Sequence, residues 1–254
     1  MEQIPIVSFN FFSRNGHFRR PYSNVSSFSY PFPPRTAIAG LLGAILGINK
    51  EKVSETFSTE KSKIGISLNK QVETFTHVSN FRQTSSGDIN YSIKISKKSK
   101  KLKIPNCISD SNKVAIIPME LLKNPSYLIY VSMDNFMDEL ISRLKAQRYV
   151  YTPCMGLSEF LAQIEYVSEG YAQPLGAREA EVSTVINKDD CSLWIDKINS
   201  SNGYNIQELK VPHVSTPERT FNYKTYLVNW TSNPIPVKMK NSGYIFEDKV
   251  ITFL

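Results

Sequence analysis

Apolar and polar residues alternate near the start of the chain, and the pattern then changes to a helical period. In residues 4–12, Val7, Phe9 and Phe11 fall on one side of an extended chain, which predicts a half-buried strand. A segment rich in Gly, Ser and Pro follows, and residues 33–47 then carry apolar side chains three and four positions apart. This spacing predicts a helix whose apolar stripe consists of Ile38, Leu41, Leu42, Ile45 and Leu46.

Three glycines accompany this predicted helix. Gly40 and Gly43 lie inside it, where each weakens an isolated helix by roughly 1 kcal/mol relative to alanine. We interpret them as sites where another backbone approaches closely. Gly47 follows the last apolar residue and is the expected C-terminal cap, while Thr36 is an expected cap or first residue.

The middle of the chain contains further strand patterns and one more helix pattern. Asp134 is an expected N-cap, and residues 134–148 combine an apolar stripe with basic residues near the end, which favour a helix C-terminus. Short apolar or alternating runs predict strands at residues 63–69, 71–78, 126–132 and 161–167.

In chain order these elements predict an α+β protein with two parts. Residues 1–172 give strand, helix, strand, strand, helix, strand, which is the βαββαβ order of the ferredoxin-like fold and of RNA-recognition modules. Residues 79–113 are a long polar insertion, which we interpret as a protruding β-hairpin thumb. Residues 173–254 contain short strand patterns and predict a smaller β-rich C-terminal extension.

Most of the net charge lies in one short segment. The chain has 30 basic and 23 acidic residues, a formal charge of +7, and the six lysines of residues 94–103 occur without any acidic residue. A concentrated basic arm fits phosphate binding better than a general basic coat does. From the charge alone, a solvated lysine-rich loop is an equal alternative.

Residues with metal-binding or redox chemistry are few. Cys107, Cys154 and Cys191 are far apart, which argues against a disulfide framework or a zinc site and suits a reducing cytoplasm. The acidic pairs lack a nearby His or Cys at ligand spacing, and no glycine-rich phosphate loop occurs. No apolar run approaches the roughly 20 residues of a membrane span, and no secretory signal is visible. We therefore expect a cytoplasmic protein without metal, cofactor, membrane contact or small-molecule substrate.

Histidines are the side chains that exchange protons near neutral pH, and the chain has three. His17 lies beside two arginines and, with a nearby tyrosine, has the residue types needed for RNA cleavage. We favour RNA binding or a surface position for it. His77 lies in a strand pattern and His213 follows a proline, and both are interpreted as structural residues. The sequence therefore predicts a protein that is not an enzyme.

Three motifs resemble one known family. The first is SYPFPPRTAIAGLLGAILG at residues 29–47, the second YTPCMGLSEFLAQIEY at 151–166, and the third KVPHVSTPERTFNYKTYLV at 210–228. Together they are similar to the Cas-five family of the RAMP superfamily, which belongs to type I CRISPR Cascade effector complexes. The short loops and the C-terminal part are most similar to the type I-B branch.

This resemblance implies a non-catalytic subunit that holds the repeat-derived 5′ handle of the guide RNA (crRNA) in antiviral defence. It also implies that the chain caps one end of the complex, contacts the backbone subunit and the large subunit, and grips RNA with its thumb. One branch of the family cleaves precursor crRNA with a Tyr–Lys–His set in which Lys and His are adjacent. The chain has no Lys-His dipeptide. A metal-independent endoribonuclease and a general RNA-binding protein are the alternatives.

With this resemblance, basic and aromatic residues outside the regular elements become the expected RNA contacts. Arg35 opens the first helix, whose N-terminal N–H groups attract phosphate, and Tyr30 and Phe28 could stack on bases or instead lock the helix entry. The complete expected set is His17, Arg19, Arg20, Tyr30, Arg35, Arg82, Lys94, Lys97, Lys98, Lys100, Lys101 and Lys103.

Overall fold

The computed structural model describes residues 2–21, 27–82, 114–200, 203–216, 220–240 and 243–254. The elements in chain order are β1 Ile4–Ser13, β2 Asn15–Gly16, α1 Arg35–Leu46, α2 Val53–Thr56, β3 Ser62–Leu68, β4 Thr74–Arg82, β5 Val114–Lys123, β6 Ser126–Met133, α4 Met137–Ala146, β7 Ala162–Leu175, β8 Glu179–Val182, β9 Ile186–Asn187, the 3-10 helix η2 Lys188–Asp190, β10 Cys191–Leu193, α5 Ile195–Asn199, β11 Ile206–Ser215, β12 Phe221–Asn229, β13 Ile235–Met239, β14 Gly243–Phe246 and β15 Lys249–Ile251.

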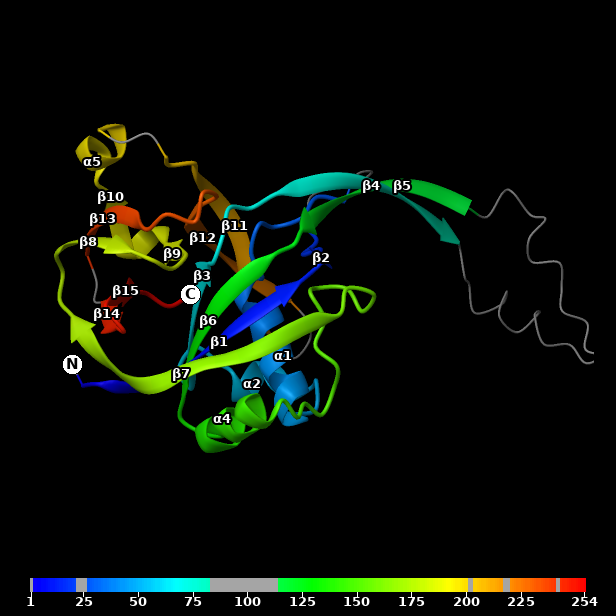
Figure 1. The fold of residues 1–254 in the computed structure, drawn as a ribbon, viewed down its shortest axis with the longest axis horizontal. Coiled ribbons are helices and arrows are strands. Elements are labelled where there is room, and N and C mark those ends of the chain that lie inside the picture. The colour runs from blue at the N-terminus through cyan, green and yellow to red at the C-terminus, as the bar shows by residue number, and fades with distance from the viewer. Residues whose placement is uncertain (1, 22–26, 83–113, 201–202, 217–219, 241–242) are drawn as a thin grey trace, which may run out of the picture.

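The fold is a mixed α+β architecture dominated by sheets. The largest sheet has the strand order β10-β13-β8-β15-β14-β7-β1-β6-β3, and β1 pairs antiparallel with both β6 and β7. The helices α1, α2 and α4 lie on one side of its β7-β1-β6-β3 half (Figure 1). Val7, Phe9 and Phe11 are buried in the core that α1 completes, as their alternation predicts.

The first predicted helix is confirmed, and every residue of its apolar stripe is buried. It begins after Pro34 without a side-chain cap, so Thr36 does not cap it, and Gly47 closes it in the left-handed conformation at φ 76°. A Cβ at Gly43 would lie 2.8 Å from a methyl group of Val53, whereas one at Gly40 would meet nothing within 4 Å. The expected close approach therefore exists only at Gly43, where a side chain of α2 makes it.

The second predicted helix is confirmed with a different start. Phe136 is the N-cap at φ 66°, and no side-chain cap bond is formed, so the expected cap at Asp134 is wrong. The chain turns tightly before the helix instead of entering it in the extended conformation that suits an Asp cap. Of the apolar stripe, Leu140 and Leu144 are fully buried and Phe136 is exposed.

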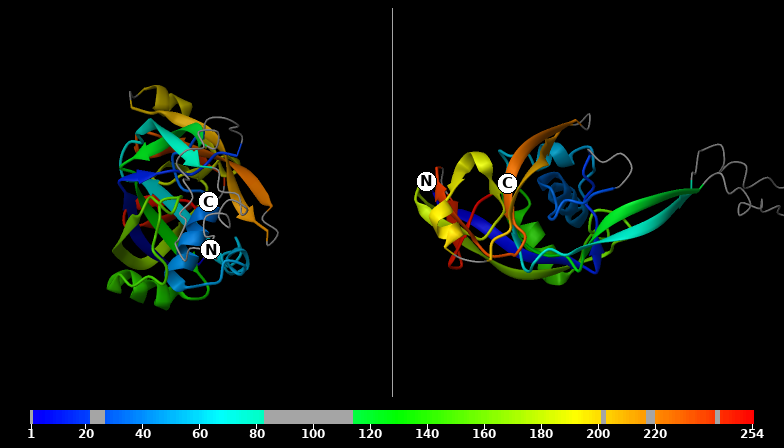
Figure 2. Two further views of the ribbon diagram at one scale, coloured as in Figure 1. Left: turned by 90° about the vertical axis from the view of Figure 1, so that its right-hand side faces the viewer. Right: turned by 90° about the horizontal axis from the view of Figure 1, so that it is seen from above.

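Strands β4 and β5 form an antiparallel ribbon that extends away from the body (Figures 1 and 2). Their register runs from Thr74 opposite Leu122 to Arg82 opposite Val114. Within the described chain, β4 pairs only with β5, so its other edge is open. Residues 83–113, which include most of the predicted thumb insertion and all its lysines, lie outside the described residues.

The C-terminal part continues the large sheet. β7 passes through the predicted boundary at residues 172–173, pairing with β1 at first and with β14 at its end. Phe246 and Ile251 then pack with Ile6 on the sheet face opposite the helices. Separately, β11, β12 and β9 form a three-stranded sheet. Its Val211, Tyr226 and Val228 join the core around α1, whereas Ile186 and Leu227 pack in a second core with the C-terminal strands. No helix in the described segments is long and apolar enough to cross a membrane.

We expect Leu42→Ala to lower the free energy of unfolding by roughly 2–5 kcal/mol. Leu42 is fully buried on the stripe of α1, so its truncation leaves a cavity in the main core. Urea unfolding followed by circular dichroism measures the change, and a loss below about 0.5 kcal/mol would contradict a core position for this stripe.

The two helix glycines provide matched controls in the same unfolding experiment. Gly40→Ala should raise stability by up to about 1 kcal/mol, because alanine favours a helix and the new methyl group meets open space. Gly43→Ala should be less stable than Gly40→Ala, because its new methyl group would collide with Val53.

Candidate nucleic-acid interface

The described residues 17–21 and 27–30 form a segment between two ribbons that diverge from the body, β4–β5 and β11–β12 (Figure 2). On one side, Ser27 N donates to Pro118 O at 3.1 Å, and Glu120 N donates to Ser27 O at 2.9 Å. On the other side, the Tyr30 hydroxyl donates to Lys210 O at 2.9 Å. This segment therefore fixes both ribbons to the entry of α1.

His17 is a buried structural residue, so the expectation that it contacts RNA is wrong in this structure. Its side chain is 2% exposed. Nδ1 donates to Glu120 O at 2.8 Å, and Nε2 of the neutral ring accepts from Ser27 Oγ at 2.9 Å. Burial is the main cause that holds the pKa of His17 below its usual value, and nearby Arg19 adds to the effect. The ring has neither the exposure nor a free nitrogen for an RNA ligand.

Tyr30 and Arg35 also point inward, which corrects their expected role as RNA contacts. Tyr30 is 2% exposed, so its ring locks the helix entry and offers no face to a base. Arg35 is 3% exposed, and its guanidinium donates to Ser62 O at 3.0 Å and to Ser58 O at 3.2 Å. The Arg35 side chain at the positive end of α1 is therefore bonded to backbone carbonyls and is not available to a phosphate.

Arg19, Arg20 and Phe28 form the accessible part of this segment. Arg20 N donates to Phe28 O at 2.9 Å, which makes a short two-stranded ladder of residues 18–20 and 28–30. Arg19 is exposed, and Phe28 is 49% exposed. Arg20 is half-buried, with Nε donating to Ser29 O and the guanidinium 5.5 Å from the Tyr30 ring centre. Arg20 is opposite Phe28 on the ladder and lies beside its ring, whereas Arg19 is opposite Ser29 and lies on the other face. A cation beside an exposed aromatic ring can bind a phosphate while a base stacks on the ring.

The neighbouring ribbon adds residues that sequence reasoning did not select. Lys210 lies 6.0 Å from the ring centre of the half-buried Tyr223, and Lys224 is exposed on the same strand as Tyr223. Phe221, at the start of this strand, is also exposed. The signal was present in the third motif, which begins with Lys210 and in which the aromatic residues 221, 223 and 226 flank Lys224. We use the name inter-ribbon surface for Arg19, Arg20, Phe28, Lys210, Tyr223 and Lys224. Within this set Lys210 and Tyr223 share one face of the β11–β12 ribbon, whereas Lys224, opposite Val211, lies on the other face.

The other two histidines have different surroundings. His213 is buried as predicted, with Nδ1 at 2.7 Å from the Tyr226 hydroxyl, and burial lowers its pKa to about 4. His77 is exposed on β4, so the interpretation of it as a structural residue is wrong. It lies on the ribbon face that carries Phe75, directly opposite Met119.

The remaining expected contacts fall on the ribbon or beyond it. Arg82 ends β4, but its side chain is not among the described groups, and Lys94, Lys97, Lys98, Lys100, Lys101 and Lys103 lie outside the described residues. Among the described residues, no group of three or more His, Cys, Asp or Glu side chains could hold a metal ion. Cys154 and Cys191 are free thiols, and burial raises the pKa of Cys191 to about 11.

Solved structures with the same fold come from CRISPR systems. A protein described as "Crystal structure of a CRISPR protein from Archaeoglobus fulgidus" matches with a TM-score of 0.53 at 12% identity, covering 99% of this chain and 100% of that one. A chain of a "CRISPR RNA-guided surveillance complex" matches with a TM-score of 0.51 at 10% identity, covering 92% of this chain and 91% of that one. The chain therefore has the sheet-dominated α+β fold found among CRISPR proteins.

The family follows from the sequence comparison. Residues 6–221 match the family model described as "CRISPR-associated protein (Cas_Cas5)". Because the match spans most of the chain, the protein belongs to the Cas5 family, as its three motifs indicate. No curated protein matched the sequence.

The buried His213 should make the folded state sensitive to mild acid. The pKa of His213 is about 4 in the folded chain, whereas its usual value, which applies to the unfolded chain, is 6.5. The unfolded chain therefore binds the proton more readily. Stability from the neutral ring is complete above pH 6.5 and is lost as the pH falls towards 4, by up to about 3 kcal/mol. Urea unfolding across this range should show a steeper loss for the wild type than for His213→Gln. Parallel curves for the two proteins would refute this assignment.

Proposed function

We propose that the chain is a crRNA-binding subunit of a type I CRISPR Cascade complex, which holds the 5′ handle of the guide in antiviral defence. The observation that carries this proposal is the inter-ribbon surface, where Arg19, Lys224 and Phe28 are exposed on segments that hydrogen bonds join. Single-stranded RNA is bound by cations that follow its phosphates and by aromatic rings that stack on its bases. Membership of the Cas5 family supports RNA as the ligand.

The strand order supports a ferredoxin-like assignment for the N-terminal part. Four strands lie in the order β7-β1-β6-β3, all antiparallel to their neighbours. α1 lies between β1 and β3 in the chain, and α4 lies between β6 and β7. These are the crossovers of a βαββαβ unit. The β4–β5 ribbon is inserted between β3 and β6, where we assign the thumb.

The exposed apolar residues of the ribbon support contacts with other subunits. Val78 is 57% exposed and Ile116 is 69% exposed, and they are diagonal neighbours on one face because Val78 pairs with Pro118 and Asn80 with Ile116. Aliphatic side chains gain from burial but offer no base-stacking face. We assign this face to a protein neighbour, the backbone subunit or the large subunit of a cytoplasmic complex.

We propose that the subunit positions RNA without cutting it. Metal-independent cleavage needs a base, an acid and a cation around one phosphate. His17 and His213 are buried and bonded within the protein, so neither is accessible for proton transfer to RNA. His77 is exposed but lies on the β4–β5 ribbon and not on the inter-ribbon surface.

Removal of charge from the inter-ribbon surface should weaken guide binding and reduce its salt dependence. Arg19→Gln with Lys224→Gln removes two exposed cations, so the slope of log affinity against log salt should fall by about 1.4, or about 0.7 for each lost single-strand phosphate contact. Fluorescence anisotropy with repeat-derived 5′-handle RNA measures this slope. The control, Lys50→Gln with Lys52→Gln, removes the same charge near α2 and should keep the wild-type slope. Equal slopes in all three proteins would exclude this surface as the guide site.

Purified protein should leave precursor repeat RNA uncut in EDTA. The expected result is intact RNA on a denaturing gel for the wild type, for His77→Ala and for Arg19→Gln, because the described chain brings no accessible histidine to the inter-ribbon surface. A defined cut by the wild type that is lost in His77→Ala would establish the endoribonuclease alternative instead.

A further inference from the structure

A hollow of about 510 Å³ lies where the β4–β5 ribbon joins the large sheet. Its volume is within the range of small-molecule sites. Phe12 of β1 points into it, and this residue alternates with Phe11, which faces the core around α1. The hollow is therefore on the sheet face away from α1. Its lining consists of Phe12, Ser13, Arg14, Lys70, Asn124, Pro125, Ser126, Leu161 and Gln163.

The strand register places polar groups on both sides of the half-buried Phe12 ring. Phe12 pairs with Gln163 on β7 and with Ser126 on β6, so these three side chains form one row across the sheet. Asn69 extends the row, since its amide donates to Ser126 Oγ at 3.1 Å and to Asn10 Oδ1 at 3.0 Å. An aromatic ring on a central strand is thus flanked by amide and hydroxyl groups.

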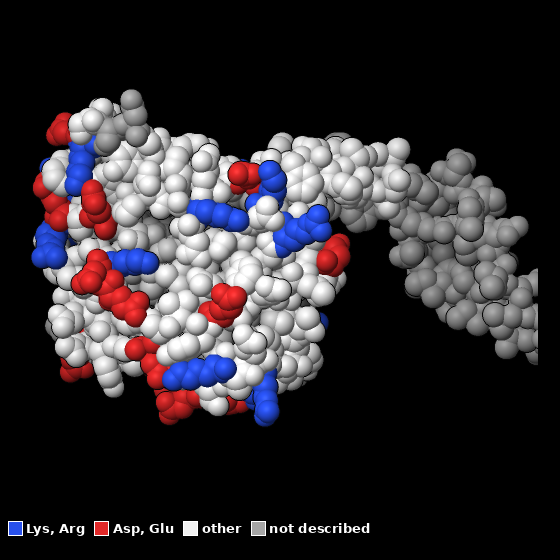
Figure 3. All heavy atoms as spheres, viewed as in Figure 1, with Lys and Arg blue, Asp and Glu red and all other residues white. Residues whose placement is uncertain are grey.

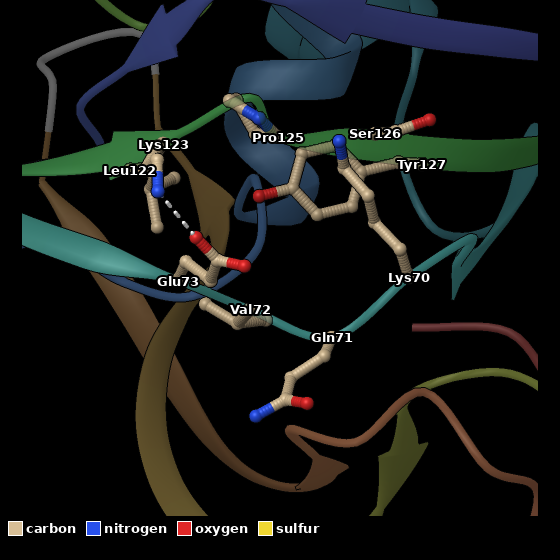
Figure 4. A pocket seen from close by; sticks show the side chains of 9 residues that line it. All are labelled: Lys70, Gln71, Val72, Glu73, Leu122, Lys123, Pro125, Ser126 and Tyr127. Carbon is tan, nitrogen blue, oxygen red and sulfur yellow. Dashed lines mark ion pairs between the residues drawn. The ribbon is translucent and has the colours of Figure 1, made fainter.

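The hollow also contains two cations without an ion-pair partner among the described residues. Arg14 and Lys70 are both exposed, and no acidic residue lines the hollow. In the small pocket beside the hollow, Glu73 Oε2 forms an ion pair with Lys123 Nζ at 2.9 Å. The Glu73 carboxylate points towards Lys123 and not towards Lys70 (Figure 4). Where the ribbon meets the sheet, basic side chains lie beside acidic ones, and both signs of charge also occur over the far end of this face (Figure 3).

The rest of this sheet face is already covered. Ile6 and Tyr130 are buried beneath Phe246 and Ile251 of the C-terminal part. A Cβ at Gly65 would lie 2.9 Å from Thr252 O, so the cover is in direct contact with β3. The C-terminal part therefore closes one half of the face and leaves the end that carries Phe12 open.

We propose that this hollow binds one nucleotide of a single-stranded RNA. The base stacks on Phe12, Gln163 and Ser126 hydrogen-bond its edge, and Arg14 and Lys70 hold the adjacent phosphates. The site is separate from the inter-ribbon surface, which lies beside α1. This inference rests on the proposed function only because it takes RNA as the ligand. The hollow would be a second RNA contact of the same chain, on the opposite face of the sheet.

The chemistry of the hollow favours RNA over an acidic protein segment. An acidic segment would use the two cations but would have no planar group for the Phe12 ring. A nucleotide uses every feature, because each base has a π-face for stacking and an edge with both donors and acceptors. Amide side chains such as Gln163 match such edges.

Photocrosslinking and binding with the full-length chain test the proposal. The probe is a decamer of uridine with a single 4-thiouridine, and the crosslinked peptide is identified by mass spectrometry. We expect a crosslink in the peptide that contains Phe12, and about tenfold weaker binding for Phe12→Leu, which keeps an apolar side chain but removes the stacking face. Arg14→Gln with Lys70→Gln should reduce the salt slope by about 1.4, whereas Lys50→Gln with Lys52→Gln should not change it.

The outcomes separate this inference from the proposed function. The proposed RNA site is supported if Phe12→Leu and Arg14→Gln with Lys70→Gln both weaken decamer binding while their unfolding curves match that of the wild type. If the hollow variants match the Lys50/Lys52 control while Arg19→Gln with Lys224→Gln is weakened, the hollow is not an RNA site and the proposed function stands. The decamer could instead crosslink at Phe12 while the protein binds handle RNA no more tightly than the decamer. That result would support the hollow as an RNA site and refute the proposed handle-binding role. Displacement of the decamer by oligoglutamate, with no effect of Phe12→Leu, would make the hollow a protein-anion site and overturn the proposal.

Discussion

The hydrogen bonds around Glu120 hold together the parts of the molecule that the proposed interface needs. Its backbone carbonyl accepts from His17, its N–H donates to Ser27 O, and its carboxylate accepts from the N–H of Ser29. Buried polar groups cost about 1–3 kcal/mol each when they lack a partner, so these bonds strongly favour a single position on β5 for residues 17 and 27–29. Tyr30 extends the connection to β11. The exposed Arg19 and the half-buried Arg20 are therefore close to a hydrogen-bonded support.

The two faces of the large sheet have different roles because side chains alternate along each strand. On β1, Phe9 and Phe11 fill the core with α1, while Ile6 and Phe12 point to the other side. The C-terminal strands cover Ile6 but not Phe12. The single strand β1 thus stabilises the helical core, contacts the C-terminal part and provides the Phe12 ring of the hollow where the β4–β5 ribbon joins the large sheet.

Local patterns in the sequence predicted the central elements well. The strand with Val7, Phe9 and Phe11 and the helix with Leu42 on its stripe follow from alternation and helical period, which burial in one core enforces. The RNA contacts expected at His17, Tyr30 and Arg35 were wrong because their polar, proline-rich neighbourhood is typical of an exposed loop, whereas contacts with distant residues bury it. No local pattern reports pairing with a carbonyl about a hundred residues away, as in His17 and Glu120. The third motif did contain Lys210 and Lys224, but the connection of their ribbon to Tyr30 depends on the tertiary fold.

The open edge of β4 has a consequence for the protein outside its complex. Residues 74–81 contain neither lysine nor proline, the two residues that most often keep an edge strand from pairing with another chain. With unpaired backbone groups along this edge, the ribbon of one molecule is a template for the ribbon of a second. The isolated chain can then associate through intermolecular sheet formation, and any partner that covers this edge would prevent such pairing.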